Sequence, residues 1–228
     1  MAGNHNQMVL LLTHPRTASN LVTRILNLED QSGFMFNEYF FLPSFERRLD
    51  LAERGFENWT DEERNDLIGS LLVSLRGLSH HMIAAEGRRK RAFAKEHLMW
   101  MLRPEALHWA RPGVGTIEVG PISNLTILPD SFLTKCVPTF LIRHPALVFP
   151  SIYRTCLDLE GPEKARRNAD GIFRLEMTWR WSRHMWQSYN GQIIDETNSQ
   201  GPSWDDKVSG SPWPIILDAD DAFFIQTS

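Results

Sequence analysis

Four short segments rich in apolar residues are spaced along the chain, and the stretches between them carry apolar residues at helical spacing. The segments cover residues 8–13, 92–98, 137–142 and 214–218. A continuous apolar run such as Met8 to Leu12 is typical of a parallel strand covered on both faces. Strands that alternate with helices predict an α/β fold, with a central parallel sheet flanked by helices in three layers and right-handed crossovers.

Start signals and periodicity predict the helices between these strands. Thr60 followed by Glu63 has the pattern of a capping box, in which the side chain of each residue accepts a hydrogen bond from the backbone N–H of the other. A later helix is expected to carry Ile172, Leu175 and Trp179 on one face, together with Trp186. The predicted helices cover 21–28, 60–75, 146–159 and 163–189, whereas 34–45 is expected to be irregular and 190–212 turn-rich and flexible.

Composition and charge narrow the class of protein. A chain of 228 residues with 42% hydrophobic and 23% charged residues fits a single folded domain over 1–228. The net charge of −4 offers no broad basic field, so a nucleic-acid partner is not expected. No apolar stretch approaches the length of a membrane span, so a soluble, cytoplasmic protein without a membrane partner is predicted. Cys136 and Cys156 lack a zinc-ligand spacing and indicate a reducing compartment.

The segment that follows the first strand has the character of an anion-binding loop. Arg16, Thr17, Ala18, Ser19 and Asn20 end a strand and open a helix. Backbone N–H groups at a helix start favour an anion, and an arginine binds phosphate oxygens through two parallel donors. The Walker A pattern is absent, which argues against a nucleoside triphosphatase. The structural alternative is a helix capped by Thr17 or Ser19 after a turn.

Two further polar clusters follow or end predicted strands. Arg143 closes the third strand and Ser151 lies eight residues later, early in the next helix, so both could face one phosphate. Side chains alternate between the two faces of a strand, so Lys95 and His97, two positions apart on the second strand, share one face. Imidazole is suited to accept a proton and an ammonium to stabilise negative charge. The structural alternatives are a salt bridge for Arg143, a helix cap for Ser151 and a structural role for His97.

In order and character these clusters resemble the sulfotransferases that use 3′-phosphoadenosine 5′-phosphosulfate (PAPS). The stretch from Thr13 to Leu21 is similar to their 5′-phosphosulfate loop, the stretch from Leu141 to Tyr153 to their 3′-phosphate element, and the triplet 95–97 to their Lys-Thr-His. The resemblance covers roughly 8–221, with 214–221 similar to a strand of fungal secondary-metabolism members. It implies a P-loop NTPase-like sulfotransferase fold.

The resemblance also implies a role for each candidate residue. His97 would be the general base, and Lys95 and Arg16 would stabilise the leaving group as catalytic residues. Thr17, Ala18, Ser19 and Asn20 would hold the 5′-phosphosulfate with Arg16, and Arg143 and Ser151 the 3′-phosphate. PAPS is the expected co-substrate, and no metal site is expected. The acceptor would be the hydroxyl of a small, aromatic or polyketide-like metabolite, and the arrangement allows a homodimer.

Several departures from the family keep other functions open. Arg16 replaces a lysine, Ala18 a glycine and Asn20 a threonine, and alanine reaches positive φ less freely than glycine. No counterpart of the family's basic Arg-Lys-Gly segment, which also contacts the 3′-phosphate, is expected among residues 222–228. The alternatives are a sulfotransferase-fold protein repurposed for another acid/base step, or a non-catalytic nucleotide-binding paralogue. The acceptor pocket is predicted from the aromatic and apolar residues Phe34, Phe36, Tyr39, Phe40, Phe41, Trp100 and Met101.

Overall fold

A five-stranded sheet forms the centre of the protein in a computed structural model that describes residues 7–52, 54, 58–107, 124–197 and 214–224. The strands are β1 (Met8–Thr13), β2 (Phe34–Glu38), β3 (Arg91–His97), β4 (Cys136–Ile142) and β5 (Ile215–Asp218). Their order is β2-β3-β1-β4-β5, and every neighbouring pair is parallel. The predicted α/β fold with a central parallel sheet is confirmed.

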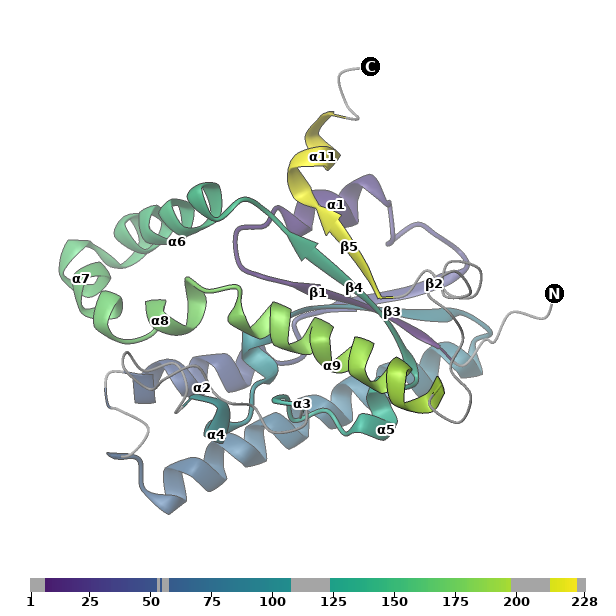
Figure 1. Ribbon diagram of the computed structural model, residues 1–228, viewed down its shortest axis with the longest axis horizontal. Coiled ribbons are helices and arrows are strands. Elements are labelled where there is room, and N and C mark those ends of the chain that lie inside the picture. Colours follow the sequence, from purple (N-terminus) through teal and green to yellow (C-terminus); the bar gives the residue numbers. More distant parts are fainter. Residues whose placement is uncertain (1–6, 53, 55–57, 108–123, 198–213, 225–228) are drawn as a thin grey trace.

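Helices cover both faces of this sheet (Figure 1). On one face lie α1 (Ser19–Ile25) and α11 (Ala219–Phe224), and on the other lie α3 (Asp61–Gly87) and α9 (Arg180–Thr197). The helices α6 (Pro145–Glu160), α7 (Pro162–Asp170) and α8 (Phe173–Glu176) extend from the end of β4. The remaining helical elements are α2 (Leu42–Ala52), the 3₁₀ turn η2 (Leu98–Met101), α4 (Pro104–Leu107) and α5 (Asp130–Leu133).

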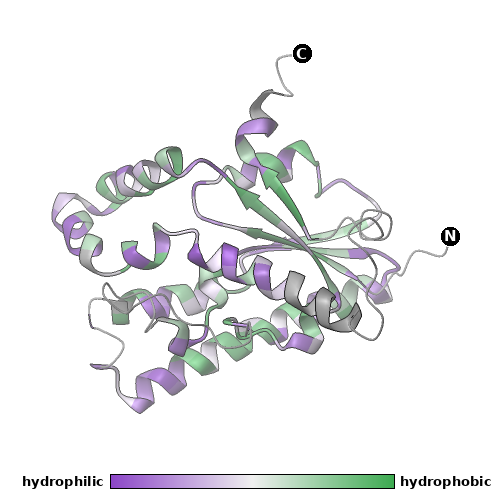
Figure 2. Ribbon diagram, viewed as in Figure 1, coloured by the Kyte–Doolittle hydropathy of each residue, from purple (hydrophilic) through white to green (hydrophobic). Residues whose placement is uncertain are grey.

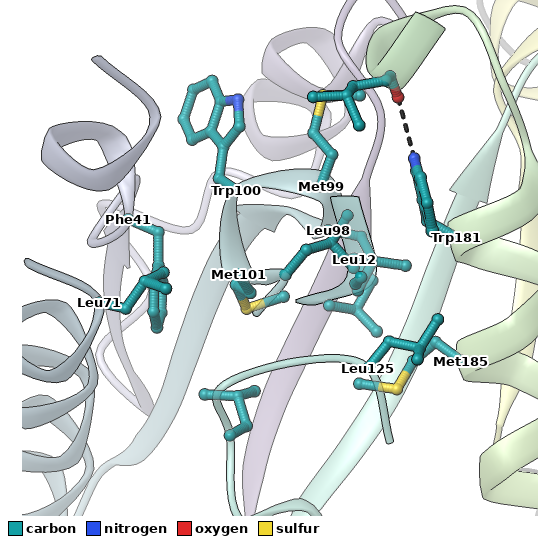
Figure 3. Close-up of a cluster of buried hydrophobic side chains, with 14 of the residues drawn as sticks. Leu12, Phe41, Leu71, Leu98, Met99, Trp100, Met101, Leu125, Trp181 and Met185 are labelled. Atoms are coloured by element: carbon teal, nitrogen blue, oxygen red, sulfur yellow. Dashed lines mark hydrogen bonds between the residues drawn. The ribbon is translucent and has the colours of Figure 1, made fainter. Parts of the chain in front are cut away.

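The side chains of β1 alternate between two apolar cores. Met8, Leu10 and Leu12 belong to the larger core, whereas Val9 and Leu11 belong to the smaller core beside α1. Both faces of the strand are therefore buried, which explains its uninterrupted apolar run. Figure 2 shows the strands as the most continuously hydrophobic part of the ribbon. Figure 3 shows part of the larger core, where the Trp181 indole donates to the carbonyl oxygen of Leu175 at 3.0 Å.

The helix α3 begins as its capping box predicts. The Thr60 hydroxyl accepts from the Glu63 backbone N–H, and the Glu63 carboxylate accepts from the Thr60 backbone N–H. The helix then continues to Gly87, well beyond the expected end at residue 75. By length and composition α3 could cross a membrane. Its buried residues include Leu67, Leu71 and Leu78 in the larger core.

Three local predictions are wrong. Residues 34–38, expected to be irregular, form the edge strand β2, because they pair in register with β3. The single helix expected over 163–189 is divided into α7, α8 and α9. It breaks at Gly171, where φ is −116° and ψ is −106°, and restarts after Thr178, whose hydroxyl accepts from the Arg180 N–H at 3.1 Å. Residues 190–197, expected to be turn-rich, continue α9, and 198–213 lie outside the described residues.

Candidate functional site

The candidate residues gather at the carboxyl end of β1, the central strand. β1 lies between β3 and β4. After β1 the chain continues to β2 and β3 on one side of it, and the later strands β4 and β5 lie on its other side. Such a reversal separates the connections and opens a crevice at the strand ends, where ligands bind in open parallel sheets. The topology therefore brings the loop after β1, the end of β3 and the start of α6 to one place.

Arg16 and Ser151 meet directly across this crevice. The Arg16 Nε donates to the Ser151 Oγ at 3.0 Å, although 135 positions separate the two residues. Arg16 is exposed, and Ser151 lies in the second turn of α6, so Ser151 does not cap the helix. The predicted 5′-phosphosulfate loop and the predicted 3′-phosphate element thus adjoin, with an exposed guanidinium between them.

Thr17 and Ala18 shape the loop. The Thr17 side chain is fully buried and its hydroxyl donates to the His14 carbonyl oxygen at 2.7 Å, so it braces the turn. Arg16 and Ala18 both have positive φ, 67° and 59°. Ala18 is in the left-handed region at the start of α1, and no side chain caps that helix. The loop therefore adopts the conformation that the family's glycine would favour, with an alanine in its place.

Replacing Ala18 by glycine is expected to raise the free energy of unfolding by about 0.5–1 kcal/mol. A left-handed φ costs an L-residue about 1–2 kcal/mol, and this exceeds the extra entropy that glycine loses on folding. Urea denaturation monitored by circular dichroism measures the change. Ala84→Gly, in the interior of α3, is the matched control and should destabilise by about 1 kcal/mol. A loss of stability in both variants would contradict the strained position of Ala18.

Asn20 connects the loop to the middle of the sheet. Its Oδ1 accepts from the Lys95 Nζ at 2.6 Å and from the Tyr39 hydroxyl at 3.1 Å. Because ammonium is only a donor, these contacts orient the amide with its oxygen inward and its NH₂ group away from Lys95. Asn20 is exposed, so this NH₂ group is a donor available at the mouth of the crevice.

Lys95 is completely buried in this network. Its ammonium forms an ion pair with Glu38 on the neighbouring strand β2 and lies 4.5 Å from the centre of the Tyr39 ring. Buried ammonium groups require such partners, since desolvation is otherwise costly. Lys95 thus reaches the loop through Asn20, and Glu38 compensates its charge. Sequence reasoning did not identify Glu38, because β2 was not predicted as a strand.

His97 is held in one tautomer by the end of β1. The Thr13 hydroxyl donates its single hydrogen to the Glu96 carbonyl oxygen at 3.0 Å and lies 2.7 Å from the His97 Nδ1. The ring must therefore donate from Nδ1, which leaves the lone pair on Nε2. No other hydrogen bond of the ring involves the described residues. Burial, then the charges of His14 and Lys95, lower the pKa of His97 to about 3, so the ring is neutral at physiological pH.

Arg143 lies on the other side of the α6 start, against α11. Its Nε donates to the Asp220 Oδ1 at 3.1 Å, an ion pair that agrees with the structural alternative for this arginine. Arg143 also lines a cavity with a volume of about 460 Å³, next to Trp179, Trp186 and Ile216. This volume falls in the range of small-molecule pockets. Neither Arg16 nor His97 lines this cavity, so Arg143 faces a space that these two residues do not reach into.

A second cavity, with a volume of about 200 Å³, opens beside the loop. Pro15 and Arg16 form one wall, and apolar side chains from α2, α6 and α8 form the others. Two carboxyl groups, Glu160 and Glu176, also line it. Neither glutamate was identified from the sequence, because the break that places α8 beside α6 was not predicted.

The predicted aromatic acceptor pocket is not found as a single pocket. Phe34 and Phe36 pack on Phe93 in the smaller core, whereas Phe41 and Met101 are fully buried in the larger core on the opposite face of the sheet. Phe34 and Phe36 share one face of β2, whereas Phe41 follows that strand and Met101 lies in η2, so the sheet separates the two sets. Tyr39 and Trp100 do lie at the site, with ring centroids 5.2 Å and 4.4 Å from His97.

This arrangement defines the class of protein: it is an α/β domain in which a loop with an exposed arginine lies at the strand ends, near a neutral histidine held in one tautomer. Within the described ranges, no three His, Cys, Asp or Glu side chains gather to hold a metal ion. Arg16, Asn20 and Ser151 carry hydrogen-bond donors that suit an anionic group at the crevice.

The comparisons with known proteins agree with this class. The chain is 36% identical over 231 residues to the sulfotransferase ppzF of Metarhizium majus (strain ARSEF 297) and 36% identical over 229 residues to that of Metarhizium rileyi (strain RCEF 4871). Each match covers 92% of the chain and 65% of the relative's length. No family model matches the sequence. The chain is therefore similar to these fungal sulfotransferases over 92% of its own length, which bears out the resemblance found from the motifs.

Proposed function

We propose that the protein transfers a sulfuryl group from PAPS to a hydroxyl group of a small acceptor. The main support is the direct contact of Arg16 with Ser151, because it joins the two phosphate elements at one crevice. The relation to the ppzF sulfotransferases supports the same reaction, although the chain spans only 65% of their length.

The donor would span the two sides of the α6 start. Arg16, Ser19 and Asn20 line the loop end, where the phosphosulfate would lie. Arg143 and Ser151 would hold the 3′-phosphate. Arginine has five N–H donors, so Arg143 can contact Asp220 through Nε and a phosphate as well. The 460 Å³ cavity beside Arg143 is large enough for the nucleoside part of the donor.

In the proposed reaction, His97 accepts the acceptor's hydroxyl proton on Nε2 as the acceptor oxygen attacks sulfur. The new oxygen–sulfur bond forms as the bond between sulfur and the bridging phosphate oxygen breaks. The leaving 5′-phosphate takes up the negative charge, which Arg16 and the Asn20 amide stabilise. Lys95 would act through Asn20, since its ammonium is buried against Glu38.

The donor site is tested by replacing Arg143 with alanine and titrating 3′-phosphoadenosine 5′-phosphate calorimetrically. Loss of a charge-assisted contact to phosphate is expected to weaken this nucleotide about 10- to 100-fold. AMP, which lacks the 3′-phosphate, should bind the variant and the unaltered protein alike. Arg154→Ala, at an exposed position of α6, is the matched control. Equal losses for both nucleotides would remove the 3′-phosphate from Arg143, and no nucleotide binding to the unaltered protein would overturn the proposed function.

A further inference from the structure

The 200 Å³ cavity beside the loop contains a carboxyl group that makes no hydrogen bond or ion pair with the part of the chain that the structure describes. Glu176, at the end of α8, is 9% exposed and lines the cavity. Among the described residues, no hydrogen bond or ion pair reaches its carboxyl group. A largely buried carboxyl group without a protein donor is unfavourable, and its position at a cavity wall leaves room for a donor from a ligand.

A second carboxyl group supports the same reading. Glu160, at the end of α6, lines the cavity and its Oε2 accepts from the Asn168 amide at 3.1 Å. The Cys156 thiol also lies 3.3 Å from this oxygen. These contacts hold the Glu160 carboxylate in place. Burial, and then the charge of Glu160, raise the pKa of Glu176 to about 7, which shows how poorly the free cavity supports two negative charges.

The other residues that line the cavity indicate the size and chemical nature of the ligand. Phe45, Ile152 and Phe173 give the cavity apolar sides, and its volume suits one ring with a short substituent. Arg16, its lining cation, belongs to the loop and faces the proposed donor. An acceptor in this cavity would therefore have one end at the loop and the other at the carboxyl pair.

We propose that this cavity selects acceptors that carry a protonated amine, which Glu176 binds with help from Glu160, while the acceptor's hydroxyl group faces the loop. An ammonium group would supply the missing donors and compensate the buried charge. The inference deepens the proposed function and rests on it for the orientation of the hydroxyl. Preference for the amine itself is a property of the cavity and can be measured without the donor.

The test compares three phenols of similar shape, namely tyramine, the neutral alcohol tyrosol and 4-ethylphenol, by calorimetry with and without 3′-phosphoadenosine 5′-phosphate. Tyramine is expected to bind at least about 10-fold more tightly than either neutral phenol. In Glu176→Gln this preference should fall to less than about threefold, and in Glu160→Gln it should fall less, since that carboxylate is exposed. Glu163→Gln, at an exposed position of α7, should leave it unchanged.

The outcomes separate this inference from the proposed function. If tyramine binds no better than tyrosol, or if Glu176→Gln keeps the preference, the amine site is wrong, whether or not the nucleotide binds. If tyramine is preferred and its preference depends on Glu176 but the nucleotide does not bind, the cavity assignment stands and the sulfotransferase proposal fails. Should Glu176→Gln not fold, as checked by circular dichroism, a reduced preference in Glu160→Gln with no change in Glu163→Gln would support the carboxyl pair, and an unchanged preference in Glu160→Gln would contradict it.

Discussion

Replacing His97 by alanine is expected to lower sulfuryl transfer by about 10²- to 10⁴-fold, the usual contribution of a positioned general base. Thr13 holds the ring with its lone pair on Nε2, and burial keeps the imidazole neutral. Removing the ring therefore removes the proton acceptor without altering Arg16, Asn20 or Ser151. Affinity for 3′-phosphoadenosine 5′-phosphate should accordingly change by less than about threefold. Transfer is measured with sulfur-labelled PAPS and tyramine or 4-ethylphenol, and affinity by calorimetry.

His80→Ala provides the matched control, since His80 is an exposed histidine of α3 away from the crevice. It should leave both transfer and nucleotide affinity unchanged. A parallel fall of transfer and affinity in His97→Ala would mean that His97 is structural, which is the alternative raised from the sequence. Loss of transfer alone would support the base assignment. Retention of full transfer would direct attention to another proton acceptor at the crevice.

The fold could be predicted from the sequence where burial is two-sided and local. The apolar run of β1 and the Thr60 and Glu63 pair at the start of α3 predict these elements, because both signals depend only on neighbours in the chain. β2 could not be found in this way. It is an edge strand whose residues are mostly half-buried, and its pairing with β3 joins segments more than fifty residues apart.

The candidate site shows the same division. The motifs identified Arg16, Lys95, His97 and Ser151, and the structure brings them to one strand-end crevice. The partners that define their chemistry depend on sheet register, which places Thr13 opposite His97 and Glu38 opposite Lys95. Register is set by long-range packing rather than by local pattern. Glu176 was missed for a related reason, since the break after Asp170 turns α8 toward the loop.

Replacing Arg48 by alanine is expected to lower the free energy of unfolding by about 3–5 kcal/mol, a large part of a domain's stability. Arg48, in α2, is 1% exposed, and its two terminal nitrogens donate to the carbonyl oxygens of Met99 at 2.5 Å and Leu102 at 2.6 Å. Burial lowers its pKa to about 9, so the guanidinium is still charged at neutral pH. Alanine would leave two buried carbonyl groups unsatisfied and a cavity in the core.

The neighbouring Arg47 is a matched control. Its side chain is 47% exposed and pairs with Asp66 at the surface, so Arg47→Ala should cost less than about 1 kcal/mol. Urea denaturation measures both variants, and similar small losses would contradict a structural role for Arg48. The position has a functional consequence as well. Arg48 secures the turn η2 that carries Trp100, whose ring lies 4.4 Å from that of His97. Loss of Arg48 should therefore reduce transfer together with stability, whereas loss of His97 should reduce transfer alone.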